Sequence, residues 1–180
     1  YYEQVVHYDP ENLHAHRVLQ DVYRRRRDWP RLMEAIEQEL KEASGARRLQ
    51  LLHELAEIHL QLGAPSSAED AWRQALDQDP NWFPAHMGLG QMLDGQGRWR
   101  ELAEQLSFQL STLPNDSGQR TSLLGRLAEI YEFRLDLPEK AEAAYLELLS
   151  LKEAAPDAIA GLERVYSQTG NWTALVEVLE

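Results

Sequence analysis

The sequence contains no cysteine, which excludes disulfide bonds, thiolate nucleophiles and zinc sites ligated by cysteine. No apolar run approaches the ~18 residues of a membrane-spanning helix, so we expect no membrane insertion. Positive charge is also scarce, because 18 Lys and Arg face 30 Asp and Glu and leave a formal net charge of −12. This balance argues against nucleic acid and anionic lipid as main partners. The lack of cysteine fits both the cytoplasm and the periplasm, and we favour the cytoplasm.

β-Branched residues are few as well. Val and Ile together number 11, against 29 Leu and 20 Ala. Leu and Ala keep their side-chain freedom in helices, whereas β-branched residues lose it there and pack better in strands. The composition therefore predicts a soluble, acidic, all-α protein, and its Leu-, Ala- and Arg-rich character favours a bacterial source.

The chain repeats itself with a period near 34 residues. Residues 55–59 read Leu-Ala-Glu-Ile-His, and residues 127–131 read Leu-Ala-Glu-Ile-Tyr. Leucines that are each followed four places later by a large residue recur at intervals of 36, 34, 38 and 35 residues, at Leu19, Leu55, Leu89, Leu127 and Leu162. This spacing predicts a stack of helix-turn-helix units.

The clearest unit lies between residues 49 and 80. Its first helix carries an apolar stripe at helical spacing, and residues 63–65 (Gly-Ala-Pro) suit the end of one helix and the first turn of the next. The small Ala68 would let the two helices approach closely, while Trp72 would fill the space between neighbouring units. We expect both Leu55 and Ala68 to be buried between helices.

This unit resembles a tetratricopeptide repeat, a family with a large residue, Leu, a small residue and an aromatic in one helix, followed by Ala, an aromatic, Ala and Pro. Here Leu52 and His59 replace the family's Trp and Tyr, and the remaining positions are Leu55, Ala56, Ala68, Trp72, Ala75 and Pro80. The resemblance implies a right-handed α-solenoid in which first helices line a concave groove and second helices lie on the convex side.

We expect one array over residues 1–180. It starts with the end of a preceding repeat (1–10), continues with four full repeats (11–45, 46–80, 81–115 and 116–156) and ends in an incomplete fifth (157–180). Trp29, Trp99 and Trp172 recur at intervals of 70 and 73 residues, which indicates duplication of a two-repeat module. The three tryptophans either line a binding ridge or, as we favour, pack under their own turns.

The resemblance assigns peptide binding to the residues that project from successive first helices. These charges predict a groove that is basic at its N-terminal end, acidic in the middle and mixed beyond. Such a groove suits an extended peptide with acidic and basic ends in that order; alternatively, the residues are solvated helix faces. The carboxylate clamp of some family members is excluded, because its positions hold Arg17 and Asp21, Glu54, Pro84 and Gly88. The expected groove residues are Arg17, Asp21, Arg24, His53, Glu54, Glu57, Met87, Gln91, Asp94, Arg126, Glu129 and Arg164.

Catalytic and metal-binding patterns are not found. The sequence has no nucleophile elbow, Gly-rich phosphate loop or HExxH motif, so we expect no enzyme activity and no cofactor. His53 and Glu57 stand at i, i+4, a spacing that suits two metal ligands, but no third ligand is evident. The basic run at residues 24–27 is interpreted as a complement to the helix dipole.

We expect this chain to be part of a longer protein, acting as a scaffold that binds a peptide or helix of a partner protein. One alternative is a structural spacer that positions neighbouring domains or self-associates. Another is a docking arm for a catalytic domain outside this segment. Self-association would involve apolar residues at the two ends, namely Tyr1, Val5, Val6, Leu175, Val178 and Leu179.

Overall fold

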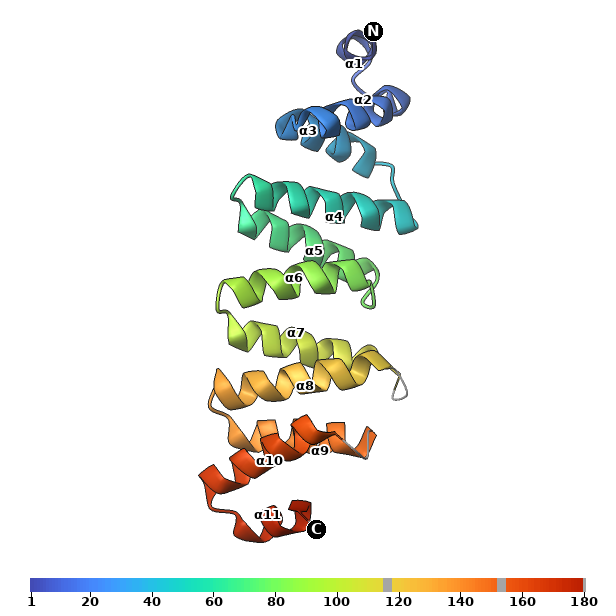
Figure 1. Cartoon of the computed structure of the whole chain (residues 1–180). Helices are drawn as coiled ribbons and strands as arrows, with labels where there is room; N and C mark the ends of the chain where they lie inside the picture. The colour runs from blue at the N-terminus through green and yellow to red at the C-terminus, as the bar shows by residue number, and fades with distance from the viewer. Residues whose placement is uncertain (115–117, 152–154, 180) are drawn as a thin grey trace. The chain divides into compact units, whose positions relative to one another are not determined.

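The computed structural model describes residues 1–114, 118–151 and 155–179, of which Leu179 is described by its backbone alone. This part of the chain is built of helices and contains no strand, so the predicted all-α class is confirmed (Figure 1). The helices are α1 (Tyr2–Tyr8), α2 (Leu13–Arg26), α3 (Trp29–Leu40), α4 (Gly45–Gln61), α5 (Pro65–Gln78), α6 (Phe83–Gly95), α7 (Trp99–Thr112), α8 (Gly118–Phe133), α9 (Pro138–Leu151), α10 (Pro156–Thr169) and α11 (Trp172–Leu179). None of these helices has the length and hydropathy that a membrane span requires.

The chain forms two compact units, residues 1–89 and residues 90–180, which we describe separately. In the first unit α2 packs on α3 and α4 packs on α5, while α3 also contacts α4. In the second unit α8 packs on both α7 and α9, and α10 packs on α8, α9 and α11. The repeat boundary expected between residues 115 and 116 lies outside the described residues, as do the side chain of Leu179 and all of Glu180; the other repeat boundaries stay predictions.

In the turns between paired helices, glycine holds the left-handed position three times and a residue with a side chain holds it twice. Gly63 follows α4 with φ of +73°, and Pro65 occupies the first turn of α5. At the corresponding turns after α6 and α10 the left-handed residues are Gly97 and Gly170. After α2 and α8, however, the left-handed residues are Arg27, with φ of +56°, and Asp136, with φ of +52°. An L-residue with a side chain pays a conformational cost there that glycine does not.

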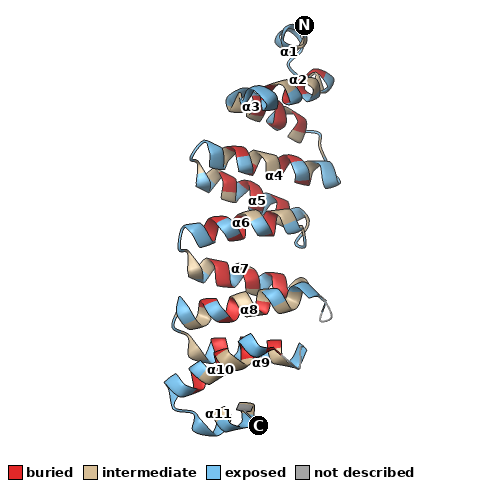
Figure 2. Cartoon of the chain, in the orientation of Figure 1, coloured by how far each residue is buried: buried red, intermediate tan, exposed pale blue. Residues whose placement is uncertain are grey.

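The core of the first unit confirms part of the predicted packing. Ala56, Ala68 and Trp72 are buried at the α4–α5 contact, as expected. Leu55, which was also expected to be buried, is only partly buried and packs against a cluster that α4 forms with α2 and α3. Buried residues recur along α4 (Figure 2). Because α4 packs on α5 and on α3, it buries two faces, and the second face adds Leu51 and Ile58 to the core.

Two buried histidines tie the start of a helix to the loop before it. Nε2 of His16 lies 2.8 Å from the carbonyl oxygen of Pro10, and Nε2 of His86 lies 2.8 Å from that of Pro80. A carbonyl oxygen only accepts, so Nε2 carries the proton in both rings. The two pairs are 70 residues apart in sequence, which repeats the interval between Trp29 and Trp99.

Candidate groove between α8 and α10

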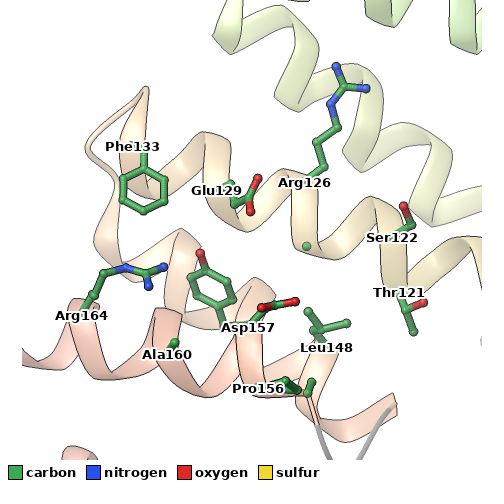
Figure 3. Close-up of a pocket in the computed structure, with 13 residues that line it drawn as sticks. Thr121, Ser122, Arg126, Glu129, Phe133, Leu148, Pro156, Asp157, Ala160 and Arg164 are labelled. Carbon is green, nitrogen blue, oxygen red and sulfur yellow. The ribbon is translucent and has the colours of Figure 1, made fainter.

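The second unit has a cavity of about 750 Å³ between α8 and α10, with side chains of α9 at its base (Figure 3). Both α8 and α10 are first helices in the predicted repeats, so the cavity occupies the face where the family resemblance places a groove. Its lining residues are Thr121, Ser122, Gly125, Arg126, Glu129, Phe133, Tyr145, Leu148, Ala155, Pro156, Asp157, Ala160 and Arg164.

Tight packing of Gly161 against Tyr145 fixes the base of the cavity. A Cβ built on Gly161 would lie 2.3 Å from Cζ of Tyr145, a distance that no side chain tolerates. Gly125 differs, because a Cβ there would meet only Leu148, at 3.8 Å and ordinary van der Waals distance. The ring of Tyr145 therefore takes its place because α10 has no side chain at residue 161.

A buried carboxylate organises one end of the cavity. Glu132 accepts a 2.6 Å hydrogen bond from the Tyr145 hydroxyl and a 2.6 Å hydrogen bond from Nε of Arg164. Burial, reinforced by Glu132, raises the pKa of Tyr145, and the hydrogen bond to Glu132 raises the pKa of Arg164. The phenol thus stays protonated at neutral pH and the guanidinium stays charged, so this end of the cavity is preorganised.

Phe133 lies beside this guanidinium. Its ring centroid is 5.2 Å from Cζ of Arg164, and the residue is 59% exposed. An exposed aromatic ring next to a rigidly held cation offers a partner both apolar area and a flat stacking surface.

Ion pairs join successive first helices. Arg24 of α2 contacts Glu54 of α4 at 2.6 Å, and Nη2 of Arg126 in α8 donates to Asp94 of α6 at 3.1 Å. Arg164 of α10 and Glu132 of α8 repeat this relationship. Three arginines that were expected to be available to a ligand, Arg24, Arg126 and Arg164, are therefore already paired with an acid one repeat away.

The first unit has a second cavity, of about 710 Å³, between α2 and α4. Arg24 lies at its edge, held by Asp21 at 2.7 Å as well as by Glu54. The cavity is lined by Arg24, Arg27, Trp29, Glu54, Glu57, Ile58, Leu60 and Gln61.

Four predicted groove residues of the first unit lie apart from that cavity's lining. Arg17 donates at 2.8 Å to Glu39, a carboxylate that is only 1% exposed and that Arg47 and Gln20 also bind. The hydrogen bond from Arg47 leads the effects that lower the pKa of Glu39 to about 2. Asp21 pairs with Arg24, and Met87 is exposed on α6.

His53 is used for packing. Its Nδ1 accepts a 3.0 Å hydrogen bond from Nε1 of Trp72, and its ring meets Trp82 edge-on with centroids 5.5 Å apart. Nε2 lies 3.5 Å from Glu57. Within the described residues no group of three His, Asp or Glu side chains is placed to hold a metal ion.

Three predicted groove residues come together in the second unit, namely Arg126, Glu129 and Arg164. Gln91 is exposed and Asp94 pairs with Arg126. The lining residues from α9 and from the start of α10, above all Tyr145, Leu148 and Asp157, were not predicted from the sequence. One signal for Tyr145 was present, since it stands 73 residues after Trp72 and repeats an aromatic in the second helix.

The tryptophans of the three similar turns differ in their surroundings. Trp29 packs against the core of the first unit, as expected for a residue under its turn. Trp99 carries the guanidinium of Arg134 over its ring at 4.7 Å, whereas Trp172 is 63% exposed. The prediction that these tryptophans pack under their own turns is therefore confirmed for Trp29 and wrong for Trp172.

Residues 49–92 match the family model described as tetratricopeptide repeat. Among solved structures, a tetratricopeptide repeat protein from Parabacteroides merdae ATCC 43184 is similar with a TM-score of 0.58 and 15% identity, covering 98% of this chain and 63% of that one. The MamA protein has a TM-score of 0.56 and 17% identity, over 94% of this chain and 89% of its own. YrrB, described as a TPR protein with an unusual peptide-binding site, has a TM-score of 0.53 and 16% identity, over 88% of this chain and 78% of its own.

No curated protein matches the sequence. The present chain spans less than two thirds of the Parabacteroides protein. At these identities the likeness concerns the fold, and it confirms the predicted resemblance in architecture.

Proposed function

We propose that this chain, which carries a tetratricopeptide repeat and shares the fold of tetratricopeptide repeat proteins, is a scaffold that binds an extended peptide or a helix of a partner protein. The observation that supports this most directly is the cavity between α8 and α10, which combines an apolar base with polar and charged edges. YrrB, a neighbour in fold, is described as having a peptide-binding site.

The arrangement of the cavity favours recognition of a peptide. Its base is held by Tyr145 and Gly161, and its end by the hydrogen bonds of Glu132, so little ordering is needed on binding. The net charge of −12 favours a protein partner over nucleic acid. The predicted residues Arg126, Glu129 and Arg164 form part of its lining and are proposed as contacts.

The test is a selection of peptides from a displayed random library by the purified chain, followed by affinity measurements on a cavity-filling variant. Ala160→Trp places a large ring into the cavity without changing any charge, and we expect the selected peptides to lose binding. Ala143→Trp is the matched control, since Ala143 is exposed on α9 and lines a different cavity, between α7, α8 and α9. Equal binding by wild type and Ala160→Trp would show that the peptides bind elsewhere, with the cavity of the first unit as the next site to test.

The alternative is a structural or self-associating spacer, and one surface of α11 favours it. Trp172 and Val176, one helical turn apart, are 63% and 54% exposed. A face of this kind normally meets another surface. Light scattering measures whether the chain forms a dimer, and Trp172→Ser with Val176→Ser should dissociate it. If this variant still binds peptides, self-association and peptide binding are separate roles. A monomer at all concentrations contradicts self-association.

A further inference from the structure

The cavity between α8 and α10 contains two arginines whose charges are already satisfied. Arg164 is bound to Glu132 through Nε at 2.6 Å and Nη2 at 3.0 Å. Arg126 donates to Asp94 at 3.1 Å, and Figure 3 shows its guanidinium directed away from α10. Recruiting either guanidinium to an acidic ligand would require breaking an existing ion pair.

Two carboxylates on the cavity edge are in the opposite situation. Glu129 of α8 and Asp157 of α10 line the cavity from its two sides (Figure 3), and both are exposed. In the described part of the chain neither has an ion pair or a side-chain hydrogen bond, in contrast to Glu132 and Asp94. Within and next to the cavity there are thus two guanidinium cations and four carboxylates. The two unpaired carboxylates line the space that a ligand would occupy.

Apolar surface lies between these carboxylates. Leu148 and Pro156 occupy one part of the cavity, Ala160 its middle and Phe133 the far end (Figure 3). Long cationic side chains suit such a surface, because their methylene stems cover apolar groups while the charged head reaches an acid.

We propose that the cavity selects a peptide whose Lys or Arg side chain enters between Glu129 and Asp157, next to an apolar residue that packs on Leu148. This inference rests on the proposed function and adds the identity of the ligand residue. A groove of mixed charge was expected from the sequence in this part of the chain; because Arg126 and Arg164 are already paired, Glu129 and Asp157 are its unpaired charges. The overall charge of −12 attracts such a peptide at long range.

Asp157 also lies in the first turn of α10, where its charge stabilises the helix N-terminus whether or not a ligand binds. A test must therefore separate helix stabilisation from ligand recognition. Glu139 supplies the control, because it is an acid in the first turn of α9 and lies outside the cavity.

The experiment uses an array of synthetic eight-residue peptides with Arg, Lys, Gln or Glu at a central position and Ala, Leu, Val, Pro or Phe at its neighbours. We expect the chain to bind Arg and Lys peptides best, with affinity that falls as KCl is raised. Glu129→Gln and Asp157→Asn should each weaken binding of these peptides roughly 5- to 20-fold and leave Gln peptides unchanged. Glu139→Gln should alter neither.

The outcomes separate this inference from the proposed function. Peptide binding that Ala160→Trp abolishes but that shows no preference for Lys or Arg, or prefers Glu, overturns the inference and leaves the peptide-binding role intact. Binding of no peptide in the array, or binding that Ala160→Trp does not change, overturns both. Losses of equal size for Glu139→Gln and Asp157→Asn would assign Asp157 to helix stabilisation and overturn its role as a contact.

Discussion

Nε1 of Trp72 donates a 3.0 Å hydrogen bond to Nδ1 of His53, and the Trp72 ring occupies the space where Gly88 would carry a side chain. A Cβ on Gly88 would lie 2.3 Å from Cζ2 of Trp72, as a Cβ on Gly161 would lie 2.3 Å from Cζ of Tyr145. In both pairs an aromatic of a second helix fills a gap in the first helix of the next repeat and hydrogen-bonds to a first helix before it. The two pairs stand 73 residues apart.

Substitution of Gly161 should therefore be costly. Gly161→Ala forces Tyr145 to move and disturbs its hydrogen bond to Glu132, so we expect a loss of roughly 1–3 kcal/mol in the free energy of unfolding. Urea unfolding followed by circular dichroism measures this loss. Gly125→Ala is the control, because its Cβ finds room and alanine favours the helix by about 0.5–1 kcal/mol. Equal effects of the two substitutions would contradict the packing described.

The turn after α2 offers a stabilising substitution. Arg27 has φ of +56°, while the corresponding turns use Gly97 and Gly170. Arg27→Gly should raise the free energy of unfolding by about 1 kcal/mol, since glycine adopts this conformation without strain. Thermal unfolding tests it, with Arg26→Gly as the control at the last residue of the helix, where the same change should not stabilise. A lower melting temperature for Arg27→Gly would show that the Arg27 side chain stabilises the turn.

Glu39 should make the free energy of unfolding depend on pH in the acid range. The hydrogen bond from Arg47 leads the effects that hold its folded pKa at about 2, below the ordinary value of 4.5. A carboxylate whose pKa is lower in the folded state stabilises the fold at pH values above its pKa in the unfolded state. This stabilisation disappears as pH falls from about 5 to about 2. The contribution is of the order of 3 kcal/mol, since one pKa unit is about 1.4 kcal/mol.

Urea unfolding at pH 7 and at pH 3 measures this contribution. Glu39→Gln should lower stability at pH 7 and reduce the difference between the two pH values. Glu37→Gln, at an exposed position of the same helix, should leave that difference as it is in the wild type. A pH dependence unchanged by Glu39→Gln would contradict the assignment.

The ionisation of Tyr145 and Tyr166 should report on the packing of the second unit. Burial and the hydrogen bond to Glu142 raise the pKa of Tyr166 to about 12, and burial also raises the pKa of Tyr145. Because a raised tyrosine pKa stabilises the fold below pH 10, this stability is lost as pH rises from 10 towards 12. Absorbance titration at 295 nm should show Tyr145 and Tyr166 ionising in a late phase. Tyr166→Phe should remove part of the late phase, and its persistence would show that other tyrosines account for it.

The sequence predicted the parts of this fold that depend on local pattern. The period near 34 residues, the Gly-Ala-Pro turn and the burial of Ala68 and Trp72 follow from helix geometry and turn preferences. The second buried face of α4, with Leu51 and Ile58, was missed because it is shared with α2 and α3 and depends on how repeats stack.

The candidate groove was predicted only in part, because its other features also depend on how repeats stack. Arg126, Glu129 and Arg164 were found from their positions on first helices, but not the pairing of Arg126 with Asp94 or of Arg164 with Glu132. Such pairs join residues 32 apart, and which carboxylate an arginine reaches depends on the register between neighbouring helices. Tyr145 and Leu148 reach the cavity from a second helix, which a search confined to first helices omits.

The contacts of Trp72 with Gly88 and of Tyr145 with Gly161 also limit how this sequence can change over generations. A glycine in either pair accepts a side chain only after the aromatic ring has become smaller, and a smaller ring leaves a void until the glycine is replaced. A single substitution in either partner is thus selected against, while a paired one is tolerated. In homologous sequences the aromatic residue and the glycine should therefore be inherited together, so that the two positions covary across the boundary between one repeat and the next.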